Sequence, residues 1–295
     1  MSTTPEPSSP MPYAAADTAA ERNHPPQMTT PTAPAEHLLL LAADFTRHND
    51  ALTRLRLNGS SPATALTHQT ASTQHLANSA LHIVDTLNAQ PMYHSPAIRT
   101  VYARVRQLAH PATDAADHLL DAVDILDDTR AGIPVQDEGP LLTYQQALGE
   151  AGSRLTLVRD LTALGAQDAL TTAELLVTER RRRGVSPLHQ PPALSPAQDA
   201  ALRAVARGEV TITDDKPYVR RDDIRVTIST IRSLESRGLV AREHCPLWLH
   251  DERVHLTADG CHGLAPTFGR PRPPALTPAR PASRPAATTA HAATR

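Results

Sequence analysis

The chain is poor in the residues that mark several large classes of protein. Only 3% of its 295 residues are aromatic, and only two are cysteines, Cys245 and Cys261. The cysteines form no CxxC pair and no zinc-binding spacing. The longest apolar run, 38–43, is far too short to cross a membrane, and no signal peptide is visible. These absences favour a protein of the reduced cytoplasm with no membrane partner.

Sequence motifs of catalysis are also missing. The chain has no phosphate-binding glycine loop, no GxSxG, no HExxH and no plausible nucleophile arrangement. We therefore assign no catalytic residue, no metal ligand and no cofactor, and we do not expect an enzyme. The formal net charge of −2 also excludes a globally basic protein.

Alanine and leucine dominate the composition, which favours helices over sheets. The 27 prolines cluster at both ends of the chain, so we expect disordered tails at 1–34 and 266–295. The second tail holds five arginines and no acidic residue. Such an arm either binds nucleic-acid backbone without sequence preference or has no binding role.

Residues 35–184 carry the apolar spacing of four long helices. The first three are expected from Ala35 to Asn58, over 62–89, and from a Ser95 cap to beyond Leu126. Pro111 predicts a kink in the third helix, or two abutting helices. A fourth helix is expected over 142–183. Short loops between long helices indicate an antiparallel four-helix array.

Two polar stripes on these helices are candidates for metal binding. His68, His75 and His82 share a helix face, but neighbours are about 10.5 Å apart along the axis, so one metal cannot join them. The second stripe is acidic and lies beside His118, but the ExxH pairs of a helical-bundle metal site are absent; it consists of Asp114, Asp117, Asp121, Asp124 and Asp128. Solvated faces are the favoured interpretation, and a bundle enzyme is the weakest hypothesis.

The run Arg180 to Arg183 closes the helical region. Four arginines suit a solvated helix C-terminus, and the alternative is contact with phosphates. Residues 185–194 are proline-rich and predict a linker. Ser195 then begins a capping box. The stretch 209–226 alternates apolar and polar residues, which favours a β-hairpin over a degenerate helix.

The stretch 227–260 predicts a short helix, a glycine stop, a strand, a hairpin, a second strand and a new helix start. Gly238 is placed where a helix ends in a left-handed residue, and Thr257 can cap the next helix. Trp248, between two leucines, is interpreted as strand packing, with a partner contact as the alternative. This order of elements is the pattern of a winged helix, which we expect over 195–265.

The same stretch resembles the winged-helix regulators of the MarR type. The resembling segments are 234–240 (LESRGLV), 251–253 (DER) and 256–260 (LTADG). The resemblance implies a DNA-binding fold in which the wing arginine, matched here by Arg253, enters the minor groove.

The candidate DNA-binding residues are arginines and hydroxyl residues that a helix over 227–237 turns outward, with an arginine on either side. Arg can fork onto guanine, and Ser or Thr can contact bases or phosphates. The set is Arg225, Thr227, Ser229, Thr230, Arg232, Ser233, Arg237 and Arg253. Against this reading, 195–265 holds ten Lys and Arg but eleven Asp and Glu, a net of −1.

The expected fold is thus mainly α, with an N-terminal four-helix array, a C-terminal winged helix and disordered tails. We expect a DNA-binding transcriptional regulator that binds double-stranded DNA as a homodimer, with the helices serving dimerisation or effector sensing. The alternative is a non-enzymatic helical scaffold whose winged helix binds protein partners.

Overall fold

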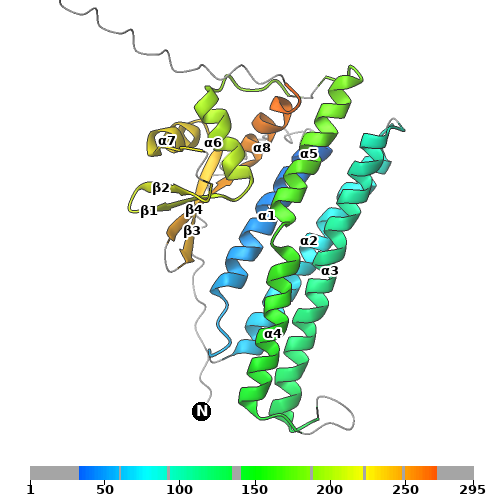
Figure 1. Cartoon of the computed structure of the whole chain (residues 1–295), viewed down its shortest axis with the longest axis vertical. Helices are drawn as coiled ribbons and strands as arrows, with labels where there is room; N and C mark the ends of the chain where they lie inside the picture. The colour runs from blue at the N-terminus through cyan, green and yellow to red at the C-terminus, as the bar shows by residue number, and fades with distance from the viewer. Residues whose placement is uncertain are drawn as a thin grey trace, which may run out of the picture. The chain divides into compact units, whose positions relative to one another are not determined.

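The protein was analysed as a computed structural model, which describes residues 33–59, 61–91, 94–134, 141–186, 189–221, 224–247 and 250–270. This part of the chain is mainly helical and carries a small four-stranded antiparallel sheet (Figure 1). None of its helices combines the length and the apolar character that a membrane span requires. Trp248, most of the predicted tail 1–34 and most of the tail 266–295 lie outside the described residues.

The first three helices lie where they were predicted, although α1 ends at Arg54, four residues before the predicted Asn58. They are α1 (Pro34–Arg54), α2 (Pro62–Asn88) and α3 (Pro96–Ala131). Ser95 caps α3 as predicted, because its side chain accepts a 3.2 Å hydrogen bond from the backbone N–H of Ile98. Pro111 lies inside α3, which continues past it, so the alternative of two abutting helices is wrong.

The predicted fourth helix over 142–183 is wrong as a single element. It consists of α4 (Tyr144–Thr162) and α5 (Gly165–Arg182). Gly165 lies directly against the ring of Phe45, which leaves no room for a Cβ atom. The break lets α4 pack on α3 while α5 packs on α1. The glycine is therefore needed for close helix approach.

The C-terminal part combines short helices with the sheet. Its helices are α6 (Pro196–Ala206), α7 (Ile228–Ser236) and α8 (Ala258–Leu264). Its strands are β1 (Val210–Thr213), β2 (Lys216–Val219), β3 (Val240–Leu247) and β4 (His250–Leu256). The strands pair antiparallel in the order β2-β1-β4-β3.

The hairpin interpretation of 209–226 is confirmed by the pairing of β1 with β2. Asp214 and Asp215 form its two-residue turn, and both have positive φ, at 49° and 58°. Positive φ at both turn residues is the type I′ geometry that suits the twist of paired strands, and Asp tolerates it better than most residues.

The predicted tail 266–295 begins too early. A turn of 3₁₀ helix covers Ala265–Thr267, and the Phe268 side chain that follows is only 1% exposed. The Arg203 guanidinium lies 5.0 Å from the centre of the Phe268 ring, a cation–π contact. The folded part therefore extends at least to Phe268.

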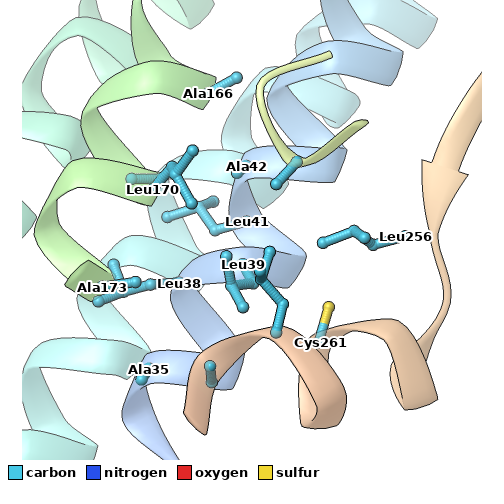
Figure 2. Close-up of a cluster of buried hydrophobic side chains, with 14 of the residues drawn as sticks. Ala35, Leu38, Leu39, Leu41, Ala42, Ala166, Leu170, Ala173, Leu256 and Cys261 are labelled. Carbon is cyan, nitrogen blue, oxygen red and sulfur yellow. The ribbon is translucent and has the colours of Figure 1, made fainter. Parts of the chain in front are cut away.

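One apolar cluster joins the helical region to the sheet-containing region. Its members include Leu39 of α1, Leu170 of α5, Leu256 of β4 and Cys261 of α8. Figure 2 shows the α1 side chains between those of α5 and those of β4 and α8. A second cluster fills the space between α3 and α4, with Leu52 of α1 and Leu66 of α2. Helix α1 thus contributes to both clusters.

Candidate nucleic-acid interface and neighbouring polar cavity

Helix α7 is short and is held at both ends. The Thr227 side chain caps its start by accepting a 3.2 Å hydrogen bond from the backbone N–H of Thr230. At its end, Gly238 has a φ of 69°, and the Leu239 N–H donates back to the Leu234 carbonyl at 3.0 Å. Ile231 and Leu234 are fully buried, and α7 packs on α6.

The opposite side of α7 carries hydroxyl and guanidinium groups. Thr227, Ser229, Arg232 and Arg237 are exposed, whereas Thr230 and Ser233 are half-buried. The Ser233 hydroxyl accepts a 3.0 Å hydrogen bond from the Gln198 amide of α6. Ser233 therefore helps to fix α7 on α6. The exposed hydroxyls of Thr227 and Ser229 lie 2.9 Å apart and are hydrogen-bonded to each other.

The three arginines around α7 differ in their hydrogen-bond and ion-pair partners. Arg232 pairs with Asp215 of the β1–β2 turn at 2.9 Å, although both side chains are more than half exposed. Arg237 donates to the Ala193 carbonyl at 3.0 Å. Arg225, in the loop before α7, is exposed and has no ion-pair partner among the residues that the structure describes. Among these three arginines, and counting partners within the described residues, Arg232 is the one that must break an ion pair to contact a ligand.

A compact ion-pair network lies beside this face. Arg242 of β3 bonds Glu235 of α7 at 2.5 Å and contacts Glu252 at 3.3 Å and Asp215 at 3.4 Å. These acceptors raise the pKa of Arg242, with the hydrogen bond to Glu235 as the largest cause. The network fixes α7 against the strands and lowers the positive charge of the surface.

Arg253 is not a freely exposed wing residue, which corrects its predicted contact with DNA. Its guanidinium binds both carboxylate oxygens of Asp50 on α1 at 2.6 Å and also donates to the Gly208 carbonyl. The two side chains are only 13% and 10% exposed. The resemblance matched Arg253 by local sequence, but its partner lies in a distant helix. Arg253 therefore joins the sheet to α1.

A polar cavity of about 330 Å³ lies between α1, α2, β3 and β4. Arg47 crosses one side of it and binds Glu243 of β3 at 2.7 Å and Asp44 at 3.1 Å. The Gln69 side chain also lines the cavity, and its Oε1 is buried without a hydrogen-bond partner among the described residues. Nothing in the local sequence indicated this cavity, because its walls come from four separate elements.

Two histidines of the cavity are held neutral. Burial lowers the pKa of His48 to about 4, and the ring contacts the hydroxyls of Ser72 at 3.1 Å and Thr73 at 3.4 Å. Burial likewise lowers the pKa of His255 to about 4, against the opposing charge of Glu243. The cavity thus offers neutral imidazoles at physiological pH.

The histidine stripe, the arginine run and the acidic stripe are either packed against neighbouring residues or exposed to solvent. His68 and His75 line the cavity, whereas the ring of His82 lies 5.9 Å from that of His37. In the arginine run, Arg180 binds Gln90 at 3.2 Å and Arg181 binds the Pro266 carbonyl at 2.5 Å. Most of the acidic stripe on α3 is exposed.

The histidine stripe on α2 and the acidic stripe on α3, which were interpreted as solvated faces, do not contain the groups that converge. Within the described residues, the group that could hold a metal ion is Glu36, His189 and His262. No protein-family model matches the chain, and neither does any curated protein or solved structure. Function must therefore be argued from the geometry alone.

Proposed function

We propose that this protein is a DNA-binding transcriptional regulator in which α7 reads double-stranded DNA and β3 and β4 form the wing of a winged helix. The observation that carries the proposal is the two-sided character of α7. Ile231 and Leu234 anchor one side, and the other presents hydroxyl and guanidinium groups. A helix supported in this way can enter a major groove, about 12 Å wide, without losing its packing.

The DNA-contacting residues fall into two proposed roles. Arg232 and Ser229 are exposed on α7, Thr227 is exposed at its N-cap, and these three would contact base edges. Arg225 and Arg237, at the two ends of the helix, would bind phosphates. Arg253 is left out of this set because it binds Asp50. The five arginines after Ala265 would add contacts to the backbone.

The helical part is proposed to serve dimerisation or effector sensing. A homodimer would double the DNA contacts and set the spacing of two half-sites. The polar cavity supports a sensing role, because its lining residues come from α1 and α2 as well as from β3 and β4. A polar ligand there would contact both parts of the molecule at once.

Protein binding by the same face is the second candidate. The pairing of Arg232 with Asp215 and of Arg242 with Glu235 favours it, because this surface carries acidic groups among its basic ones. DNA must displace Asp215 from Arg232, whereas a protein partner with charges of both signs need not.

Selection of bound fragments from genomic DNA, followed by gel shifts, tests the proposal. The Arg225→Ala, Arg232→Ala double variant should weaken binding and reduce its salt dependence. The matched control is Arg106→Ala with Arg130→Ala, which removes the same charge from α3. If the wild type and the first double variant bind alike at moderate salt, readout through α7 is wrong. Light scattering on the full chain tests the homodimer.

A further inference from the structure

Three side chains from distant parts of the sequence converge at the start of α1. Glu36 lies in the first turn of α1, His189 precedes α6, and His262 belongs to α8. One potential ligand atom from each lies within 4.8 Å of the other two. We infer that a divalent transition metal of the zinc class binds here and ties the segment before α6 to α1 and α8.

The Glu36 carboxylate is the buried member of this group. Its side chain is 3% exposed, and it accepts a 3.0 Å hydrogen bond from the Ala33 N–H. No lysine or arginine in the described part of the chain pairs with it. A buried carboxylate needs a compensating positive charge. A metal ion held jointly with two imidazoles supplies that charge.

The distances suit ligands of one ion better than hydrogen bonds. Nε2 of His189 lies 3.5 Å from Glu36 Oε1, and Nε2 of His262 lies 3.4 Å from Oε2. Hydrogen bonds of this type are normally about 2.7–3.2 Å long. Tetrahedral ligand atoms bound to zinc at about 2.0–2.1 Å stand about 3.3–3.4 Å from one another. A pair of ligand atoms at the full 4.8 Å would have to close by about 1.5 Å.

A nearby carboxylate and a small cavity lie beside these three residues. Asp259 Oδ1 lies 3.9 Å from Nδ1 of His262, on the ring edge opposite Nε2. A carboxylate hydrogen-bonded to that edge is the usual outer partner of a metal-bound histidine, and Asp259 would have to approach by about 1 Å to take this role. A cavity of about 140 Å³ borders Glu36 and His189. Three protein ligands leave one position for water or a small ligand, and the cavity provides the space.

The chemical class of the metal follows from the donor set. Two imidazoles and one carboxylate suit Zn²⁺ and its neighbours better than Mg²⁺ or Ca²⁺, which prefer oxygen ligands. His189 and His262 are about one-third exposed, so the ion can reach them from solvent. The inference is independent of the proposed DNA binding, since none of its ligands lies on α7.

Metal uptake by the untagged full chain is the direct test. Protein stripped with a chelator is titrated with Zn²⁺ against a chromogenic competitor, and Co²⁺ serves as a spectroscopic probe. The wild type should bind one tight equivalent. In His189→Ala and in His262→Ala the affinity for this one Zn²⁺ ion should fall by roughly 10–100-fold or more. That range is the usual effect of removing a residue that only hydrogen-bonds a metal ligand. The control His110→Ala removes an exposed histidine of α3 and should leave it unchanged.

Thermal unfolding gives a second readout that separates binding from folding. Zn²⁺ at about 100 times its Kd should raise the wild-type midpoint by roughly 5–10 °C. His189→Ala, in an irregular segment, should keep the metal-free midpoint and lose this rise. The inference is overturned if the wild type binds Zn²⁺ no more tightly than the two histidine variants. It is also overturned if His110→Ala loses as much affinity as they do.

Discussion

Arg253 on β4 and Asp50 on α1 bind each other through two hydrogen bonds of 2.6 Å, although 203 residues separate them in the sequence. The pair is nearly buried, and the guanidinium also donates to the Gly208 carbonyl. A second ion pair, between Arg47 and Glu243, joins α1 to β3. Charged groups thus fix the sheet on α1 beside the apolar contacts.

Breaking the first of these pairs should destabilise the protein. Arg253→Ala or Asp50→Asn leaves one buried group without its partner, so each should lower the free energy of unfolding by about 3–5 kcal/mol. The double variant should lose less than the sum. Denaturant unfolding measures all three.

The control for this prediction is Arg130→Ala. Its pair with Asp127 is more than half exposed, so the loss should stay under about 1 kcal/mol. A loss for Arg253→Ala no larger than that of the control would mean that Arg253 is free to serve elsewhere, including on DNA.

Asp215 should act as an electrostatic competitor of DNA. It holds Arg232 at 2.9 Å and Arg242 at 3.4 Å, and its φ of 58° is one that Asn also adopts. Asp215→Asn removes the charge with little change of shape, so DNA affinity should rise roughly two- to tenfold at low salt. Fluorescence anisotropy with a selected fragment measures the change. Asp127→Asn, which removes one charge from α3, should have little effect, and equal effects of the two would refute the role of α7.

Stability should fall as the cavity histidines become protonated. Burial holds the pKa of His48 at about 4, against about 6.5 in the unfolded chain. The unfolded state therefore binds the proton first as the pH falls. The stabilisation is complete above about pH 6.5 and is lost towards pH 4, by up to about 3 kcal/mol.

His48→Gln tests this contribution, because glutamine can still hydrogen-bond but does not titrate. The free energy of unfolding of this variant, measured between pH 7 and pH 4.5, should depend less on pH than that of the wild type. His110→Gln, at an exposed site on α3, should behave like the wild type. Identical slopes for the two variants would show that His48 is protonated equally in the folded and unfolded states.

Two glycines of neighbouring helices should respond in opposite ways to alanine. At Gly165 a Cβ atom would collide with Phe45, so Gly165→Ala should cost about 1–3 kcal/mol. At Gly149, inside α4, a Cβ would meet no atom within 4 Å, so Gly149→Ala should stabilise by about 0.5–1 kcal/mol. Thermal unfolding of both variants checks the signs. A Gly165→Ala protein as stable as the wild type would mean that the Phe45 ring can move aside at little cost.

The sequence alone predicted features whose causes are local. Ser95, Ser195 and Thr257 cap helices as expected, because a cap needs only a hydroxyl three residues before its N–H partner. The mainly helical class and the β1–β2 hairpin followed from periodicity in the same way.

Features that depend on distant residues were missed. The close approach of Gly165 to Phe45 and the pairing of Arg253 with Asp50 both join residues that are far apart in the sequence. Glu36, His189 and His262 lie in three separate segments, so no spacing rule could have grouped them. Such contacts arise only when the chain folds back on itself.

The apolar cluster shared by α1 and the C-terminal elements has a calorimetric consequence. Leu39 and Cys261 belong to the same buried group, so neither region can melt without exposing the core of the other. A heating scan should therefore give a single peak whose van't Hoff and calorimetric enthalpies agree. A ligand that binds the folded form of one region would therefore raise the free energy of unfolding of the other region by the same amount, because the two unfold together.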